Sequence, residues 1–456
     1  MSEQTELKEL QFDQDYTMEE AMAEANRCLN CPKPLCRTGC PIANEIPRFI
    51  QAIAQGNFGQ ANDILAERTN LPAICGRVCA REKQCEGHCI MNKAKKPPIN
   101  IGKLERFAAD FESTHIKRKT RPIIQNNGNV AVIGSGPAGL SVAGDLAKLG
   151  FKVTVFEGQP EPGGILLFGI PEFRLSKTIV RREIKRLENL GVEFVCNTFI
   201  GPDKTIDALL NEDGFDAVFI GTGTHVPATV KLKNEELPGV LQAMFLLTTE
   251  QLRLNGQLDD FEVPVQPGDR VVIIGAGNVA IDAARTSIRC GAKSVTIAYR
   301  RTQAQMPANP SEYEEAVEEG IQFKWLASPV GVEGDGKVES FQYEVQSIDE
   351  EGNVSGTGKI ESMPADKVII AVGHKPMSNL IGQGNHIKVD DRGYIITSEE
   401  EDCYGMTSRE GVFAGGDVVH RPATVVLAMR EAKKAVDGIV KYIEVKKAKE
   451  AAETAK

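Results

Sequence analysis

The first part of the chain, up to about residue 120, contains short segments in which apolar residues recur with helical spacing. Residues 18–27, 46–54 and 102–111 show this spacing, and it predicts three amphipathic helices. A basic, turn-poor stretch follows at residues 115–121. We interpret it as a solvated linker rather than as a docking patch for a partner.

From residue 129 onward the pattern changes to buried-type strands that alternate with helices. Two regions each predict a strand, a helix and a second strand, at residues 130–133, 140–149 and 152–156 and again at residues 270–274, 280–290 and 294–299. Further strands, predicted at 218–224 and 368–373, lie on either side of the second region. Two βαβ units suggest two dinucleotide sites, and the bracketing strands suggest that the second domain is inserted into the first.

Composition narrows the class of protein. At 456 residues the chain is long enough for about three domains, and its 41% hydrophobic and 25% charged residues are typical of a globular protein. The net charge of −10 argues against nucleic-acid binding. No apolar run approaches the roughly 18 residues of a membrane span, and the acidic N-terminus lacks the apolar core of a signal peptide. We therefore expect a soluble, cytoplasmic protein that binds neither nucleic acid nor membrane.

The cysteines are concentrated near the N-terminus. Of 11 cysteines, all but three fall between residues 28 and 89. In a reducing compartment such a cluster favours metal binding over disulfide bonds.

A glycine-rich motif connects the strand at 130–133 to the helix at 140–149. It has the pattern G-x-G-x-x-G and consists of Gly134, Ser135, Gly136, Pro137, Ala138 and Gly139. The three glycines permit a tight turn, approach of a pyrophosphate, and close packing of helix on strand, while the helix N-terminus offers free N–H groups to phosphates. Glu157 ends the next strand, where a carboxylate can accept hydrogen bonds from ribose hydroxyls. Nucleotide binding is therefore favoured over a mere tight turn.

A second glycine-rich sequence, at residues 411–417, follows a strand and precedes a helical run. It resembles the second flavin signature of the flavoprotein reductases with two dinucleotide-binding domains. That resemblance implies that the first site holds FAD, with Gly416 and Asp417 beside the flavin. Taken alone, Asp417 would instead be interpreted as the N-cap of the following helix.

The second βαβ unit carries the G-x-G-x-x-A form of the motif. It consists of Gly275, Ala276, Gly277, Asn278, Val279 and Ala280. The following strand ends in Arg300 and Arg301 rather than in an acid. Arginines at this position can pair with a 2′-phosphate, so they favour NADPH over NADH. The alternative is that they are ordinary surface arginines.

The electron acceptor is the next question. Disulfide reductases place a redox dithiol close to the flavin or in the NADPH domain, but residues 161–166 contain no cysteine and Cys290 stands alone. A thioredoxin-reductase mechanism is therefore disfavoured.

The cysteine block forms two quartets. The first, Cys28, Cys31, Cys36 and Cys40 followed by proline, resembles the ferredoxin run, in which the fourth cysteine ligates a different cluster from the first three. The second quartet is Cys75, Cys79, Cys85 and Cys89. Structural zinc sites usually pair two separated C-x2–4-C units. The pattern therefore favours two [4Fe-4S] clusters over zinc, and disulfides come third.

This N-terminal block, the stretch at 98–107 and both glycine motifs resemble the small subunit of NADPH-dependent glutamate synthase. They equally resemble the NADPH-binding subunit of the ferredoxin:NADP transhydrogenase and the N-terminal half of dihydropyrimidine dehydrogenase. Residues 163–174 are similar to the flavin-side loop of that family, which adds Gly164 and Arg174 to the FAD site.

The resemblance implies an α/β flavoprotein fold with two dinucleotide-binding domains, preceded by an α-helical iron–sulfur domain. Residues 1–120 would form the iron–sulfur domain, residues 121–240 and 371–456 the FAD-binding domain, and residues 241–370 the inserted NADPH-binding domain.

It also implies that each cluster takes ligands from both quartets. One cluster would be held by Cys28, Cys31, Cys36 and Cys89, and the other by Cys40, Cys79, Cys85 and the carboxylate of Glu105. Cys75 would then be a spare thiol. A local arrangement, with Cys75 as a ligand in place of Glu105, is the competing assignment.

The expected function is electron transfer from NADPH through FAD and two clusters to a partner, with no catalytic side chain. The chain has no N-terminal cysteine for glutamine hydrolysis and no room for a (β/α)8 barrel, so we expect a hetero-oligomer. The resemblance favours the FMN-containing large subunit of glutamate synthase, which makes glutamate from 2-oxoglutarate and glutamine. A transhydrogenase flavoprotein with ferredoxin, or a pyrimidine-reducing subunit, is the alternative partner. A zinc-bound interaction module is the non-enzymatic alternative for the N-terminal block.

Overall fold

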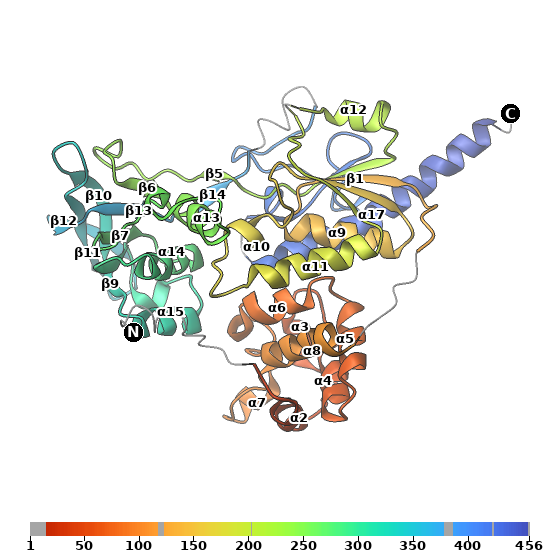
Figure 1. Ribbon diagram of the computed structural model, residues 1–456, viewed down its shortest axis with the longest axis horizontal. Helices are drawn as coiled ribbons and strands as arrows, with labels where there is room; N and C mark the ends of the chain where they lie inside the picture. The colour runs from red at the N-terminus through yellow and green to blue at the C-terminus, as the bar shows by residue number, and fades with distance from the viewer. Residues whose placement is uncertain (1–14, 117–122, 202, 378–385, 422–423, 455–456) are drawn as a thin grey trace. The chain divides into compact units, whose positions relative to one another are not determined.

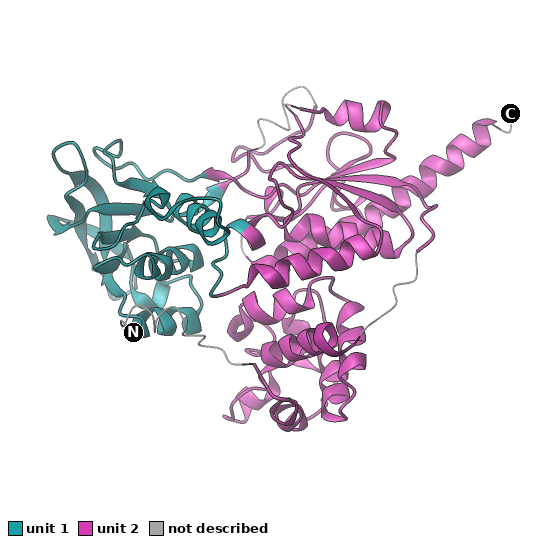
Figure 2. Cartoon of the chain, in the orientation of Figure 1, with its two compact units in different colours: residues 1–14, 168–173, 227–374 teal, residues 15–167, 174–226, 375–456 magenta. Residues whose placement is uncertain are grey.

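The computed structural model describes residues 15–116, 123–201, 203–377, 386–421 and 424–454. Within them the chain forms two compact units, which Figure 2 colours separately. Unit 1 contains residues 168–173 and 227–374, and unit 2 contains the remaining described residues. Unit 1 is thus inserted into unit 2 along the chain, which is the kind of arrangement that the bracketing strands predicted.

The N-terminal part of unit 2 is a helical domain (Figure 1). Its elements are α2 (Met18–Asn26), α3 (Leu35–Gly39), α4 (Ile46–Ala54), α5 (Phe58–Ala66), α6 (Pro72–Val78), η1 (Arg81–Lys83), α7 (Ile90–Lys93) and α8 (Ile101–His115). The three helices expected from apolar spacing are present as α2, α4 and α8, and α8 extends beyond the expected range. The linker expected at 115–121 lies mostly outside the described residues.

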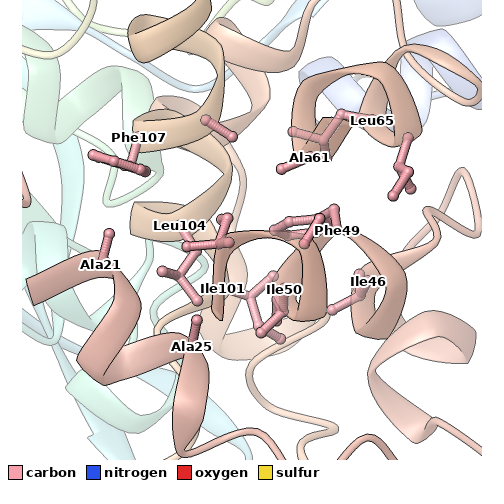
Figure 3. Packing of buried hydrophobic residues seen from close by; sticks show 14 of the residues in the cluster. Ala21, Ala25, Ile46, Phe49, Ile50, Ala61, Leu65, Ile101, Leu104 and Phe107 are labelled. Atoms are coloured by element: carbon pink, nitrogen blue, oxygen red, sulfur yellow. The ribbon is translucent and has the colours of Figure 1, made fainter. Parts of the chain in front are cut away.

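The core of this helical domain lies between its longer helices. Apolar residues of α4 and α8 meet there, and Phe49 and Leu104 have no exposed surface (Figure 3). Helix α2 begins with a capping box, because Thr17 Oγ1 accepts a hydrogen bond from Glu20 N and Glu20 Oε2 accepts one from Thr17 N. The sequence analysis did not anticipate the shorter helices α3, α6 and α7, because their 5, 7 and 4 residues are too few to show helical spacing.

The rest of unit 2 is a parallel five-stranded sheet with the order β15-β4-β1-β2-β3. Its strands are β1 (Asn129–Ile133), β2 (Lys152–Phe156), β3 (Glu193–Val195), β4 (Ala217–Ile220) and β15 (Val412–Ala414). Its helices are α9 (Pro137–Lys148), α10 (Ile165–Phe168), α11 (Lys177–Asn189), α12 (Ile206–Asn211) and α17 (Val425–Thr454). Helix α9 packs against both α11 and α17, and the short turns η4 (Glu401–Cys403) and η5 (Gly416–Val418) flank β15 in sequence.

Unit 1 has a second parallel sheet, with the order β6-β13-β7-β8-β9. Its strands are β6 (Val240–Gln242), β7 (Arg270–Ile274), β8 (Ser294–Tyr299), β9 (Gln322–Trp325) and β13 (Lys367–Ile370). Helices α13 (Ala243–Leu254), α14 (Asn278–Arg289) and α15 (Pro310–Glu318) and the turns η2 (Asp260–Glu262) and η3 (Gln303–Gln305) belong to the same unit. The chain enters this unit through β5 (Val226–Pro227) and leaves it through β14 (His374–Lys375).

Unit 1 also contains an antiparallel sheet that the sequence analysis did not anticipate. It consists of β10 (Ala327–Glu333), β11 (Ser340–Ile348) and β12 (Val354–Pro364). The two bracketing strands are shorter than expected, because β4 ends at Ile220 and β13 at Ile370, before the glycine-containing segments that follow them. The fold expected from the sequence, two dinucleotide-binding domains after a helical domain, is otherwise confirmed. In the described part of the chain, no helix is long and apolar enough to cross a membrane.

The helical domain is attached to the sheet domain by polar contacts at α9. Asn70 Nδ2 donates to Ser141 O at 3.2 Å and to Asp145 Oδ1 at 2.8 Å, and Lys148 Nζ donates to Ala66 O at 3.0 Å. Asn70 is buried. Buried hydrogen bonds of this kind are costly to break, so the contacts of Asn70 stabilise the attachment of the helical domain to α9.

The turn between β1 and α9 depends on the absence of side chains. Gly134 has a φ of +93°, a conformation that glycine adopts at little cost. A Cβ on Gly139 would lie 1.9 Å from Gly134 O. A methyl group at residue 139 would therefore force helix and strand apart, whereas at Gly136 a Cβ would meet no atom of the described residues within 4 Å.

We predict that Gly139→Ala destabilises unit 2, because the new methyl group overlaps a backbone oxygen that has no freedom to move. Overpacking of this kind costs about 1–3 kcal/mol or more. In protein freed of bound nucleotide, the matched variant Gly136→Ala should leave the unfolding transition near that of the parent protein. Thermal unfolding followed by circular dichroism would measure both, and equal melting temperatures for the two variants would contradict the packing role of Gly139.

Candidate functional site

Four cysteines of the helical domain line one pocket. They are Cys28, Cys31, Cys36 and Cys89. The first two lie in the loop after α2, Cys36 lies in α3, and Cys89 immediately precedes α7. The rest of the lining is mainly apolar and includes Leu29 and Ile50. The structure thus brings together the four residues expected to hold one cluster, although they are far apart in the sequence.

The remaining cysteines of the two quartets line a second pocket. Its candidate donors are Cys40, Cys75, Cys79, Cys85 and Glu105. The pocket therefore contains both of the competing ligands, the thiol of Cys75 and the carboxyl group of Glu105.

The second pocket also contains residues that the sequence analysis did not single out. Arg81 lies between two of its cysteines in the sequence, and Val426 reaches it from α17 of the sheet domain. The Cys75 thiol contacts the same helix, since its Sγ lies 3.9 Å from Met429 Sδ. Arg81 was discoverable from its place between Cys79 and Cys85. Nothing in the sequence marks Val426.

Burial makes the ionised forms of these donors unfavourable. It raises the pKa of Cys36 to about 12 and that of Cys40 to about 11, and neighbouring thiols and carboxylates add to the effect. Burial also raises the pKa of Glu105 to about 8, although the positive charge of Arg81 opposes that shift. A cation at the centre of each pocket would reverse these shifts, because thiolate and carboxylate ligands are stabilised by metal charge.

The candidate donors of both pockets are mostly cysteine thiols. In the part of the chain that the structure describes, no three His, Cys, Asp or Glu side chains converge closely enough to hold one metal ion. Cysteine-rich sets spread around a pocket are chemically suited to an iron–sulfur core, which several thiolates hold from different sides.

The first glycine loop forms an open cradle at the N-terminus of α9. Gly136 is its open position, as described above, and two further glycines pack behind it. A Cβ on Gly164 would lie 2.9 Å from Gly136 Cα, and one on Gly416 would lie 2.7 Å from Ala138 Cβ. The structure therefore gathers the predicted Gly164 and Gly416 around the first motif. Free N–H groups at a helix N-terminus bind phosphates, so the cradle fits the pyrophosphate of a dinucleotide.

Glu157 lies next to this loop, at the end of β2. Its Oε2 accepts a hydrogen bond from Ser135 N at 3.0 Å, and its Oε1 accepts one from Gln159 N at 2.8 Å. Ser135 Oγ in turn accepts a hydrogen bond from Gly163 N at 2.8 Å. These contacts fix the carboxylate at the carboxyl edge of the sheet, where a ribose is bound in this fold.

Asp417 lies in η5, directly after Gly416. Burial raises the pKa of its carboxyl group to about 6. The residue is half-buried, and a bound group that donates a hydrogen bond would stabilise its carboxylate. It does not cap the next helix, because α17 begins at Val425. Arg174, also predicted at this site, is half-buried at the point where the chain re-enters unit 2.

The second glycine loop lies in unit 1, between β7 and α14. Gly275 has a φ of +122°, and the nearest atom to a Cβ on Gly277 would be Pro307 Cγ at 4.0 Å. Ala276 is buried and Val279 half-buried beside them. The loop therefore leaves space above the N-terminus of α14 for a second dinucleotide.

Polar side chains lie in the loop of this second site and at the end of its second strand. Asn278 Oδ1 accepts a hydrogen bond from Asn309 N at 3.1 Å, which ties the loop to the segment before α15. Arg300 and Arg301 follow β8 and are both exposed. They are therefore available to a phosphate group at the carboxyl edge of this sheet.

Comparison with known protein families finds a matching family model for the N-terminal part of the chain and another for the rest of it. A family model for dihydropyrimidine dehydrogenase domain II, 4Fe-4S cluster, matches residues 4–117. A family model for pyridine nucleotide-disulphide oxidoreductases matches residues 128–432. The chain therefore combines an iron–sulfur cluster domain with an FAD and NAD(P)-binding domain.

Individual relatives agree with this division. The chain is 39% identical to the small chain of glutamate synthase [NADPH] from Escherichia coli K12, over 93% of this chain and 92% of that protein. It is 34% identical to the NAD-dependent dihydropyrimidine dehydrogenase subunit PreT of Escherichia coli O157:H7, over 93% of this chain and 94% of that protein. Among solved structures, FprA of Mycobacterium tuberculosis in complex with NADPH has a TM-score of 0.58 and 22% identity, over 73% of this chain and 87% of that chain.

The likeness to the solved structure of FprA supports the fold. The sequence identity to the glutamate synthase small chain, over almost the whole length of both chains, establishes the family. The chain belongs to the family of glutamate synthase small chains and is an NAD(P)H-dependent oxidoreductase subunit with FAD- and iron–sulfur-binding domains.

Proposed function

We propose that this chain takes electrons from NADPH, transfers them through FAD and two [4Fe-4S] clusters, and delivers them to the large subunit of a glutamate synthase. The cofactors would supply the redox chemistry: the flavin exchanges a hydride with the nicotinamide, and the clusters carry single electrons. The observation that carries the proposal is the convergence of distant cysteines on two separate pockets.

The protein's contribution is to hold these groups in place. In the first pocket we assign Cys28, Cys31, Cys36 and Cys89 as ligands, and in the second Cys40, Cys79, Cys85 and Glu105. A reducing compartment, such as the cytoplasm, is part of the proposal because these cysteines must remain reduced.

The second pocket favours a short route between flavin and cluster. Helix α17 contributes Val426 to this pocket, and Ala428 of the same helix lies near Gly416, next to Asp417. Gly416, which precedes the proposed flavin-side carboxylate, and the pocket of the proposed cluster ligands therefore both adjoin helix α17. In this arrangement Asp417 binds and orients the flavin, while apolar residues such as Val426 exclude water between the two sites.

Glu105 is favoured over Cys75 as the fourth ligand by its surroundings. Glu105 is buried, and its Oε1 accepts one long hydrogen bond, from Asn44 Nδ2 at 3.5 Å. Cys75 Sγ already has Thr69 Oγ1 at 3.8 Å and Met429 Sδ at 3.9 Å as neighbours. A buried carboxylate needs a charged partner more than a buried thiol does.

The partner and the direction of electron flow can be tested directly. The purified holoprotein, kept free of oxygen and given NADPH, is expected to reduce a one-electron acceptor. When the glutamate synthase large subunit of the same host is added with 2-oxoglutarate and glutamine, glutamate should form. Flavin reduction without any one-electron transfer would contradict the proposal. Turnover with ferredoxin and a transhydrogenase flavoprotein, or with a pyrimidine-reducing subunit, in place of the large subunit would reassign the partner.

For the second pocket we predict different results for its two candidate ligands. Glu105→Ala should lower iron and acid-labile sulfide from about eight of each per chain toward about four, because one cluster loses a ligand. Cys75→Ala should retain both clusters. Metal analysis and electron paramagnetic resonance of the reduced proteins would measure this. The reverse result would support the arrangement with Cys75, and about two zinc ions per chain without sulfide would contradict the cluster assignment.

For nucleotide choice we predict that replacing either Arg300 or Arg301 by alanine raises the KM for NADPH about ten- to one-hundredfold, because one charge-assisted hydrogen bond to a phosphate contributes about 1.5–3 kcal/mol. The KM for NADH should change by less than about threefold, since NADH has no 2′-phosphate. Arg392→Ala, which removes an exposed arginine of unit 2, is the matched control. Equal increases for both nucleotides would exclude the 2′-phosphate role.

A further inference from the structure

An exposed aromatic ring lies at the carboxyl edge of the first sheet. Phe199 follows β3, and 54% of its surface is exposed. The ring covers Gly158, because a Cβ on that glycine would lie 2.6 Å from Phe199 Cε1. Single exposed apolar residues are normal on protein surfaces. What distinguishes Phe199 is its neighbour, since Gly158 directly follows Glu157 in the sequence.

The backbone that carries this ring is fixed. Phe199 N donates to Asp203 Oδ2 at 2.8 Å. Thr198 N donates to Glu157 O at 2.9 Å, and Asn197 N donates to Gln159 O at 3.1 Å. The segment after β3 is thus hydrogen-bonded to the segment after β2 on both sides of Gly158. The position of the ring is therefore set by the protein before any ligand binds.

The geometry of the glycine loop determines which part of a dinucleotide reaches this ring. With the pyrophosphate at the N-terminus of α9 and a ribose at Glu157, the base attached to that ribose must lie just beyond Glu157. Gly158 and Phe199 occupy this position. An adenine has two flat, weakly polar faces, and aromatic side chains bind such faces by stacking.

We propose that Phe199 is the adenine-binding residue of the FAD site, with its ring packed against the adenine and with Gly158 kept small to leave room for the ring. This inference rests on the proposed binding of FAD to the Gly134 loop and adds a residue that no sequence motif identified. The same ring would contribute nothing to binding of FMN, which lacks the adenylate half.

The test measures release of FAD from the holoprotein. Phe199→Ala should release FAD about tenfold faster than the parent protein, followed as the rise of flavin fluorescence after dilution, because loss of one stacked base contact costs roughly that factor. Phe199→Tyr retains the aromatic face and should release FAD near the parent rate. Phe261→Ala, which removes a ring of unit 1 that is 76% exposed, is the matched control and should have no effect.

A double-mutant cycle tests the link to Gly158. Gly158→Ala should also speed FAD release, because the new methyl group displaces the ring. In the Phe199→Ala background the same change should add little, since no ring remains to be displaced, and this non-additivity is the signature of direct contact. If Gly158→Ala sped FAD release equally in both backgrounds, the need for glycine at residue 158 would not come from the Phe199 ring.

Release of FAD from Phe199→Ala at the parent rate would overturn the inference, as would equal acceleration by Phe261→Ala. Phe199→Leu is the control for loss of apolar packing, because leucine keeps an apolar side chain but has no aromatic face. If stacking on adenine is what retains FAD, this variant should still release FAD faster than Phe199→Tyr. Iron content should be unchanged in all these variants, and Phe261→Ala should also retain the NADPH-dependent flavin reduction of the parent protein. Failure of the inference would therefore be distinct from failure of the proposed electron transfer.

Discussion

The constraint on which the rest of the structure depends is the burial of ionisable thiols and of one carboxyl group inside the helical domain. Two pockets gather cysteine thiols and one carboxyl group, and desolvation raises the pKa of Cys36, Cys40 and Glu105 far above ordinary values. Without a cation, these groups remain neutral and contribute little attraction to one another. Helix α3 contains Cys36, and helix α7 directly follows Cys89. They have 5 and 4 residues, and helices this short are unstable alone. A metal–sulfur core that joins the segments would contribute much of the folding energy of this domain.

The same domain is firmly attached to the flavin-binding sheet domain. Asn70 binds α9 from one side, and Arg182 of α11 donates to Asp110 of α8 at 2.9 Å from another. Helix α17 then supplies Val426 to a cluster pocket. These contacts connect the helical domain to α9, α11 and α17 of the sheet domain. The nicotinamide-binding domain, in contrast, is a separate compact unit of the chain.

Much of the fold could be predicted from the sequence, because strong local patterns determine it. The two βαβ units follow from apolar runs and glycine loops, and the helices α2, α4 and α8 follow from their apolar spacing. The antiparallel sheet β10-β11-β12 was missed, because its long edge strand is mostly exposed and has no alternating apolar face.

The candidate site was predictable to a different degree in its different parts. Clustered cysteines and glycine loops can be recognised as candidate binding residues from their residue type alone. The residues that line the pockets and the loops were therefore mostly candidates before the structure was known. The grouping of Cys89 with Cys28 came from a family resemblance, since spacing alone favours local quartets. Val426 and Phe199 had no signal, because an ordinary apolar residue becomes informative when its neighbours in space are known.

Helix α17 has a consequence for how this protein is assembled in the cell. One continuous helix lies beside the flavin loop near Gly416 and lines a cluster pocket through Val426, so neither compartment is complete until the last part of the chain has been synthesised. A chain that ends before residue 425 would form the second pocket without Val426, and its Cys75 thiol would lose the contact with Met429.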